Sequence, residues 1–449
     1  MARIWGGGLS DDDDPHLEDL MITEDNEADS YLIGYEILGL ISYHIELSKN
    51  NVIPREESEE LLSSLLNLYD NIPPGVKGFE DVHSLVDSEI NRATSFGSDL
   101  RIFLSRNDQS HFDIRSFYLD RLLVLGQSLV EISSAIKRRF ENAEGFMAGY
   151  THYRQAMPVS FKTYFDYLSG IFAELAEDCL ILYGKLSIAS PLGYGSGYGS
   201  PVTVDMSQVG KSLGYKGNFE NPLKGSFYRG LDDVEVSFLL SKIMLAISRI
   251  SQDLIMYSSD EFNFLELPKG YTTGSSLMPN KRNPDFLEML QGYAAEASGT
   301  LFTTFSVLFN KGSGYHREFQ LSKDKTMAFT LRAIKILNAL PLCFAGIEID
   351  GAKAKTLMKN STYATMAAYE KFREEGKWKD AYRYIGTKLK AGEPVAEYCP
   401  DSYSGTNLTE LHTLQEKINA LIQTKKDIES ALIKTAREFI KQKKSLNIK

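Results

Sequence analysis

The chain has 449 residues, of which 43% are hydrophobic, so it can bury a sizeable core, and this composition argues against general disorder. Its net charge of −11 argues against a nucleic-acid binder, which needs a basic face for phosphates. The three cysteines are widely spaced, follow no metal-ligand pattern and are typical of a reducing cytoplasm. Because no segment has signal-peptide form or approaches the ~20 apolar residues of a membrane span, we expect a cytoplasmic protein.

Helical patterns dominate the chain, and strand signals are scarce. The chain up to about residue 103 is mixed and is interrupted at Pro73-Pro74-Gly75. Long segments follow in which apolar residues recur three and four positions apart, the spacing of a helix that is buried on one face. These segments cover residues 116–140, 160–188, 236–255 and 285–308.

Glycine-rich loops separate the predicted long helices, at 191–201 and 312–315. Beyond about residue 348 the pattern changes: 354–391 predicts short helices, and 409–442 predicts a Lys/Glu-rich terminal helix pair. Such long helices are naturally accommodated in a bundle. We therefore expect a mostly α protein in three parts, with an N-terminal mostly helical domain at 1–103, a central long-helix bundle at 104–348 and a small helical C-terminal domain at 349–449.

One segment between two predicted long helices combines glycine, hydroxyl and cationic residues: Gly274-Ser275-Ser276-Leu277-Met278-Pro279-Asn280-Lys281-Arg282-Asn283-Pro284-Asp285. Its end predicts a helix start, with Asn283 as the cap, Pro284 at the first helical position and Asp285 near the positive end of the helix dipole. The serines and cations upstream are not needed for such a cap. A flexible loop with hydroxyls and a lysine at a helix N-terminus is suited to bind a carboxylate. From the local sequence alone, a simple helix cap and a carboxylate-binding loop are about equally supported.

Four further polar segments lie near the ends of predicted long helices. They are Glu80–His83, Ser105–Gln109, Gly149–His152 and the stretch from Tyr315 to Lys323. Each is a weak signal alone, since a lone histidine such as His83 is more often structural, and Asn107-Asp108 could simply cap a helix. With the loop described above, they make five polar clusters near the ends of long apolar helices.

The 274–284 segment resembles the signature loop of the fumarase/aspartase superfamily, GSSxMPxKxNP, at every fixed position. Within that superfamily, the chain resembles the argininosuccinate lyases. The segments that stand in the order of that family are Trp5-Gly6-Gly7, Glu80–His83, Ser105–Gln109, Gly149–His152, Pro191-Leu192-Gly193 and Tyr315–Lys323. The resemblance covers residues from about 3 to 325 well and the C-terminal part loosely.

The resemblance implies a homotetramer with a multi-helix core, in which each active site is assembled from three subunits. It implies cleavage of argininosuccinate to arginine and fumarate in arginine biosynthesis, by anti elimination through a carbanion beside a carboxylate. It also implies no metal and no organic cofactor, whereas the net charge and the lack of an apolar span predict no nucleic-acid or membrane partner. Removing the hydrogen next to a carboxylate leaves a doubly negative aci-carboxylate, which positioned cations and N–H donors must stabilise.

Family position assigns roles to individual residues. Ser275 is the general base, which Lys281 and a nearby helix N-terminus would activate. Lys281 and Asn283 would also hold the reacting carboxylate, and His152 matches the histidine of proton transfer. The residues that match substrate-binding positions are Asp81, Arg106, Asn107, Thr151, Ser276, Tyr315, Gln320 and Lys323, of which the last three would bind the aspartate-like end.

The chain departs from the family at positions of the substrate-recognition shell. Leu104 and Asp232 stand where the family has arginines, Met157 stands where it has glutamine, and Leu40 stands where it often has serine. Arg229 lies three residues before Asp232 and is a candidate substitute. These changes leave the catalytic loop intact, so they bear on the substrate more than on the reaction class.

Two alternative functions remain open. One is another elimination enzyme of the superfamily, such as adenylosuccinate lyase, which would need a nucleotide phosphate pocket that no additional basic loop clearly supplies. The other is a non-catalytic structural relative. Retention of Ser275, Lys281, Asn283 and His152 argues against a purely structural role, because a scaffold has no physical need for them.

Overall fold

The computed structural model describes residues 26–201, 204–400 and 409–446. The Trp5-Gly6-Gly7 match lies outside these ranges. Helices dominate the described residues, and short strands appear in three pairs. The expected mostly α fold with a central bundle of long helices is confirmed.

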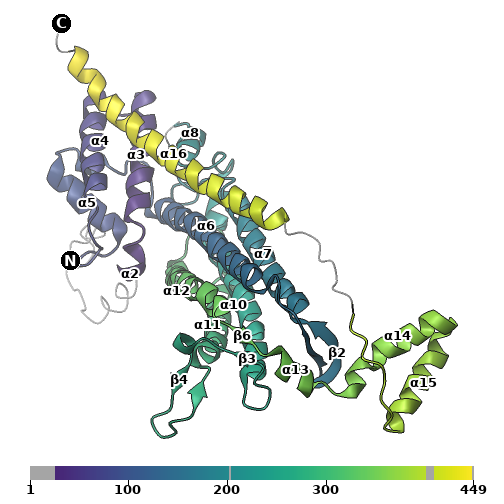
Figure 1. Ribbon diagram of the computed structural model, residues 1–449. Helices are drawn as coiled ribbons and strands as arrows, with labels where there is room; N and C mark the ends of the chain where they lie inside the picture. Colours follow the sequence, from purple (N-terminus) through teal and green to yellow (C-terminus); the bar gives the residue numbers. More distant parts are fainter. Residues whose placement is uncertain (1–25, 202–203, 401–408, 447–449) are drawn as a thin grey trace.

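Five long helices form the centre of the molecule (Figure 1). They are α6 (Arg106–Phe140), α7 (Phe161–Leu186), α10 (Leu231–Ser258), α11 (Asp285–Val307) and α12 (Gln320–Ala345). Helix α6 packs along α7 and α12, and α10 packs along α11. Each contributes apolar side chains to one continuous core, whose burial is the dominant favourable term in folding.

The bundle has two distinct ends. We call the end at which α6, α10 and α12 begin the entry end. There Asp232 and Asp233 of α10 meet the first turns of α6 and α12. We call the opposite end the hairpin end, since the strand pair that joins α6 to α7 lies there. Helices α7 and α11 run back from the hairpin end to the entry end.

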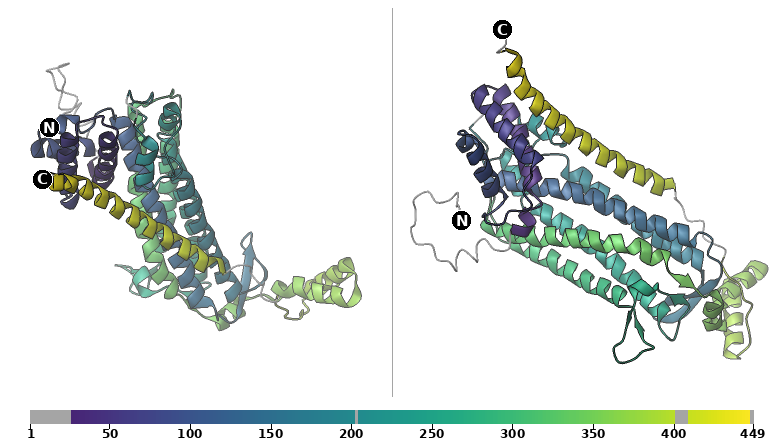
Figure 2. Two further views of the ribbon diagram at one scale, coloured as in Figure 1. Left: turned by 90° about the horizontal axis from the view of Figure 1, so that it is seen from above. Right: turned by 60° about the vertical axis from the view of Figure 1, so that its left-hand side comes forward.

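The N-terminal helices pack around the entry end (Figure 2). They are α2 (Asn26–Asp29), α3 (Ile33–Lys49), α4 (Arg55–Asp70) and α5 (Val82–Ala93), followed by the short 3-10 turn η1 (Gly97–Asp99). Short elements at the same end connect the bundle helices: α8 (Met206–Ser212), α9 (Pro222–Phe227) and η3 (Arg317–Phe319).

The last helix differs from the expected terminal pair. Residues 409–446 form a single helix, α16 (Thr409–Leu446), which lies across α3, α4 and α6. No glycine or proline interrupts this stretch, so nothing in it breaks the helix. Buried Ile418 and Ala436 show that its inner face packs on the rest of the chain along much of its length.

The segment before α16 forms short helices, as expected. They are α13 (Gly351–Leu357), η4 (Asn360–Tyr363), α14 (Ala364–Glu375) and α15 (Trp378–Lys390). Helices α14 and α15 stand away from the bundle and have a small core of their own around Tyr363 and Ile385. The domain boundaries at 103 and 348 stay predictions. The first lies just before α6, and the second lies between α12 and α13.

Three strand pairs were not anticipated. The longest joins β1 (Phe146–Thr151) to β2 (Arg154–Ser160), with a bulge between Ala148 and Tyr150. The others pair β3 (Leu265–Glu266) with β6 (Glu348–Ile349), and β4 (Thr273–Gly274) with β5 (Arg282–Asn283). The 3-10 turn η2 (Lys269–Tyr271) lies between β3 and β4 along the chain. These pairs carry or border the polar segments at the hairpin end.

Contrary to the expectation from the sequence, one segment, Arg317–Ala345, is long and apolar enough by composition to cross a membrane. Half of its apolar window is buried inside the protein, and it includes α12 of the bundle. It also contains the buried Lys323, which forms an ion pair with Asp29. These features are those of a core helix of the bundle, which can be as long and as apolar as a membrane span.

Candidate active site

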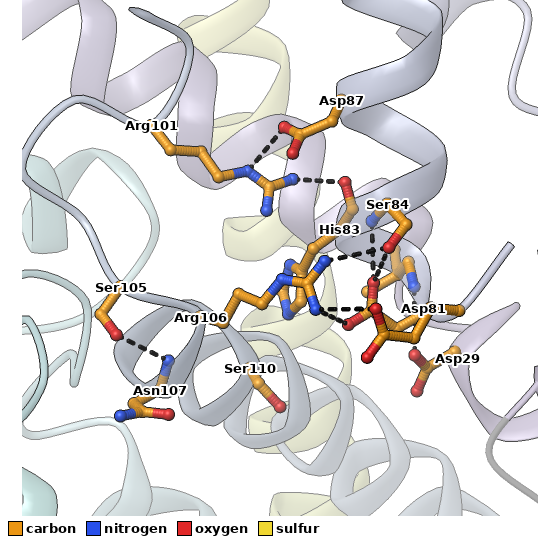
Figure 3. Close-up of polar contacts among 12 residues, drawn as sticks. Asp29, Asp81, His83, Ser84, Asp87, Arg101, Ser105, Arg106, Asn107 and Ser110 are labelled. Atoms are coloured by element: carbon orange, nitrogen blue, oxygen red, sulfur yellow. Dashed lines mark hydrogen bonds and ion pairs between the residues drawn. The ribbon is translucent and has the colours of Figure 1, made fainter. Parts of the chain in front are cut away.

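Asp81 and Arg106, two predicted substrate-binding residues, contact each other at the entry end (Figure 3). Asp81 caps α5, since its Oδ1 accepts from the Ser84 N–H at 2.7 Å. Arg106 places Nη1 3.1 Å from Asp81 Oδ2 and 3.3 Å from Glu80 Oε2. Burial raises the pKa of Asp81, but the charges of His83 and Arg106 outweigh it, and the net pKa is lowered. The carboxylate is therefore ionised and holds Arg106 in place.

Asn107 occupies the first turn of α6 with its side chain uncommitted. Its backbone N–H donates to Ser105 Oγ at 3.2 Å, and its carbonyl accepts from the Tyr194 hydroxyl at 2.9 Å. Among the described residues, its side-chain amide has no hydrogen-bond partner. The capping role belongs to Ser105 and Asp108, which form a capping box. Asn107 is thus free to contact a ligand.

Lys323 lies in the same region but is already paired. Its Nζ is buried 2.8 Å from Asp29 Oδ1, and Asp29 Oδ2 accepts from the Val82 N–H at 3.1 Å. Lys323 therefore joins α12 to α2 and α5. The other two predicted residues of this segment are half-buried: Tyr315 lies just before η3, and Gln320 is the first residue of α12.

The position at which the family has an arginine is occupied by an internal ion pair. Asp232 is buried and lies 2.6 Å from Arg115 Nε, and His111 Nε2 lies 3.0 Å from its Oδ2. Burial raises the pKa of Asp232, but Arg115 and His111 outweigh that effect and hold its pKa well below its usual range. Burial lowers the pKa of His111 to about 4, so Arg115 carries the charge.

A buried cluster beside Asp81 has ligand-type atoms close together. Glu36, His83 and Asp113 offer such atoms within 4.8 Å of one another, a geometry that could hold a metal ion. Arg101 Nη2 lies 3.2 Å from Glu36 Oε1, so a guanidinium already supplies positive charge there. Burial, followed by the charges of Glu36 and Asp29, raises the pKa of Asp113 well above its usual value. The arrangement fits a proton-sharing ion-pair cluster better than a divalent cation site.

Thr151 and His152 lie at the exposed tip of the β1–β2 hairpin. His152 and Tyr153 form its two-residue turn and have positive φ angles of 53° and 57°. A turn with positive φ at both central residues has a backbone twist that matches the right-handed twist of the flanking strands. His152 borders a cavity of about 380 Å³ that is also lined by Tyr164 and Asp253.

The signature loop projects from the hairpin end between β4 and β5 (Figure 1). Ser275 Oγ accepts two backbone hydrogen bonds, from Met278 N–H at 3.1 Å and from Leu277 N–H at 3.3 Å. Such donors stabilise negative charge on an oxygen. Ser276 follows and is exposed.

Lys281 and Asn283 border a polar cavity of about 740 Å³. The expected cap at Asn283 is wrong, because Asn283 pairs with Thr273 in the β4–β5 ladder and Pro284 takes the N-cap position. Asp285 lies in the first turn of α11 as expected, and Thr273 donates to its carboxylate.

The predicted site residues form three groups that do not meet within one chain. Asn107 begins α6, whereas His152 follows the other end of that 35-residue helix, and at ~1.5 Å per residue the helix is about 50 Å long. The cavities beside His152 and Lys281 involve different faces of α10, with Asp253 lining one and Ser258 the other. The entry-end group, the hairpin tip and the signature loop are thus three separate groups of residues.

Sequence reasoning missed His111 and Arg115, which bind Asp232. They lie four residues apart on α6, a spacing that places them on one face, but nothing local indicates a partner more than 100 positions away.

Comparison with known proteins assigns the chain a family. A family model described as a lyase matches residues 79–299. The chain is 31% identical to argininosuccinate lyase of Thermotoga neapolitana over 86% of this chain and 98% of that protein. It is 32% identical to argininosuccinate lyase of Ruminiclostridium cellulolyticum over 72% of this chain and 71% of that protein.

Solved structures share the fold. An EDDS lyase variant with bound fumarate superposes with a TM-score of 0.76 at 17% identity, covering 95% of this chain and 94% of that chain. A class II fumarase from Schistosoma mansoni superposes with a TM-score of 0.66 at 15% identity, covering 82% and 86%. The expected fumarase/aspartase-like architecture is confirmed.

Proposed function

The chain belongs to the argininosuccinate lyase family of the fumarase/aspartase superfamily, and we propose that it cleaves argininosuccinate to arginine and fumarate. The observation that carries this proposal is Ser275 Oγ, which receives two backbone N–H groups on a loop that matches the superfamily signature. An alkoxide is otherwise too unstable to act as a base near neutral pH. Donors aimed at the oxygen reduce the cost of forming it.

The reaction proceeds by proton removal followed by loss of nitrogen. Ser275 takes the hydrogen from the carbon next to one carboxylate, and Lys281 and Asn283 hold the resulting doubly negative aci-carboxylate. The electron pair then forms the double bond of fumarate as the neighbouring carbon–nitrogen bond breaks. The departing guanidino nitrogen receives a proton that His152 supplies directly or through a partner group.

Substrate binding falls to the remaining residues of the three groups. Asp81, Arg106, Asn107, Tyr315, Gln320 and Lys323 act at the entry end, Thr151 acts at the hairpin tip, and Ser276 acts on the loop. Arg106 and Lys323 are held by carboxylates of the chain itself, so they act chiefly by positioning the neighbouring residues at the entry end.

Three subunits of a homotetramer complete each active site in this proposal. The entry-end group lies about 50 Å along α6 from the two groups at the hairpin end, so the three groups cannot act together within one chain. Helices α7, α10 and α11 also leave an apolar groove of about 770 Å³, beside which Ile181, Phe238 and Phe302 are 66%, 61% and 73% exposed. Patches of this kind mark association surfaces, and a closed tetramer would bury them. Light scattering on purified protein tests this: a monomer that cleaves the substrate would contradict both the tetramer and the shared site.

The proposed setting is arginine biosynthesis in the cytoplasm, without a cofactor, nucleic acid or membrane partner. The curated relatives, which match over most of the chain, do not favour adenylosuccinate lyase or a silent structural relative. A direct experiment offers purified protein argininosuccinate and adenylosuccinate separately and follows product formation. Cleavage of argininosuccinate alone is expected, and cleavage of adenylosuccinate alone would overturn the proposal.

A further inference from the structure

Arg229 is buried at the entry end with its hydrogen-bonding capacity only partly used. Arg229 is only 4% exposed, and its Nη2 donates to Ser110 Oγ at 3.1 Å. Its Nε is buried without a hydrogen-bond partner. Within the described part of the chain, no carboxylate lies within ion-pair distance of this guanidinium. A buried charge without a counter-ion is costly, so such a group needs another reason to be present.

The neighbouring carboxylates are occupied elsewhere. Asp232 is bound by Arg115 and His111. Asp233 accepts from the Tyr118 hydroxyl at 2.5 Å and from the Ser322 hydroxyl at 2.8 Å. Burial raises the pKa of Asp233, and Arg229 is the strongest of the influences that lower it, so the two charges interact across a gap without forming an ion pair.

The backbone fixes the position of Arg229. It stands between α9 and α10, directly before Gly230, whose φ is +83°. A Cβ at position 230 would lie 2.6 Å from Leu308, so both the conformation and the space require glycine there. The chain thus turns sharply after Arg229 and keeps the guanidinium over α6 and the Tyr315 segment.

Arg229 faces residues that the proposed function already places at the substrate. Its guanidinium carbon lies 5.9 Å from the centre of the Tyr315 ring. Ser110, its hydrogen-bond partner, follows Asn107 by three residues on α6, and Figure 3 shows both on the same helix. Residues three apart are neighbours on a helix surface. The guanidinium therefore lies between the Tyr315 ring and the face of α6 that carries Asn107 and Ser110.

We propose that Arg229, with Ser110 and Tyr315, forms a carboxylate-binding subsite that takes over from the arginine replaced by Asp232. A guanidinium binds a carboxylate through two parallel N–H donors, and its Nε is the donor that this site leaves free. The ligand class is the carboxylate of the succinyl half of the substrate. This inference deepens the proposed function and rests on it for the identity of the substrate.

Succinate binding tests the subsite without requiring catalysis. Isothermal titration of the full-length protein with succinate compares the natural protein with Arg229→Met, Arg229→Lys and the control Lys311→Met. Lys311 lies on the same segment as Tyr315 and pairs with Glu318, so its loss changes the charge equally at this end of the bundle. We expect Arg229→Met to raise Kd by roughly 10- to 100-fold and Lys311→Met to leave it unchanged.

Thermal melting without ligand separates binding from a structural role. Since Arg229 has no ion pair to lose and its charge reaches Asp233 only across a gap, the midpoint of Arg229→Met should stay close to that of the natural protein. Succinate binding that is unchanged in Arg229→Met, or absent in the natural protein, would overturn the subsite. If Arg229→Met does not fold, Arg229→Lys decides: a several-fold rise in Kd supports the paired-donor site, and an unchanged Kd overturns it. Arg229-dependent succinate binding without argininosuccinate cleavage would instead reject only the proposed function.

Discussion

Asn107 lies in the first turn of α6 and His152 lies beyond the opposite end of this helix, which has 35 residues and spans about 50 Å. The rigid helix keeps them apart in every conformation of one folded chain. Both belong to the proposed site, so we expect the Asn107 of one subunit to act with the His152 of another.

Mixed tetramers should therefore recover activity from two inactive variants. Ser275→Ala lacks the proposed base, and Asn107→Ala lacks a proposed substrate contact at the other end of the bundle. If these residues come from different subunits, about a quarter of the sites in a randomly mixed tetramer are intact. Co-refolding or co-expression of the two variants, followed by a fumarate assay, measures this. Activity no higher than the sum of the separate variants would mean that one chain supplies both residues.

Loss of the Ser275 hydroxyl should lower kcat more than loss of the neighbouring Ser276 hydroxyl. Loss of a general base costs roughly 10²–10⁴ in rate, so Ser275→Ala should lower kcat by that factor with little effect on folding, because the loop is exposed. The matched control is Ser276→Ala, on the next residue, which should change KM more than kcat. Steady-state kinetics on both variants tests the assignment, and a kcat for Ser275→Ala within a few-fold of the natural value would refute it.

The hairpin turn offers a clean variant of His152. Its φ of 53° strains most residues, but asparagine tolerates this region, so His152→Asn should remove proton transfer while preserving the turn. We expect kcat to fall roughly 10²–10⁴-fold with an unchanged melting midpoint. Tyr153→Gly, which also suits its position, serves as control and should retain activity. Equal losses in both variants would show that the turn itself, rather than the imidazole, is required.

Asp232 should stabilise the fold in a pH-dependent way. Asp232→Asn leaves Arg115 buried without its partner, which should cost about 3–5 kcal/mol of unfolding free energy. Asp70→Asn, in the exposed pair with Arg437, should cost about 0–1 kcal/mol. Denaturation at pH 7 compares the variants, and equal stabilities would contradict the role of the buried pair.

The sign of the pH effect follows from the lowered pKa of Asp232. The unfolded chain takes up a proton near pH 4, before the folded protein does, so the stabilising contribution is present above about pH 4 and is lost as the pH falls below it. Between pH 5 and pH 3, the natural protein should lose more stability than Asp232→Asn.

Periodicity predicted the long helices because burial on one face imposes it directly on the sequence. The β1–β2 hairpin was missed because its strands bury few side chains and a bulge interrupts their alternation. The sequence predicts a terminal helix pair where the structure has the single helix α16, which no breaker divides and which packs on α4 and α6.

The candidate site could be predicted only as separate segments. The signature loop is contiguous, and its residues were found together with their order along the chain. The partners of Arg115 and Lys323 lie 117 and 294 positions away, and such contacts arise from the tertiary fold. The same holds for Arg229: the sequence identified it as a candidate substitute, but its free Nε and its place over Tyr315 depend on the turn at Gly230.

The most direct test of the central claim is fumarate release from argininosuccinate, followed by ultraviolet absorbance, with the natural protein and Lys281→Ala side by side. We predict steady release by the natural protein and a loss of roughly 10²–10³-fold in the variant, because Lys281 stabilises charge that develops in the transition state. No release by the folded tetramer, or equal release by both proteins, would contradict an elimination carried out on this loop.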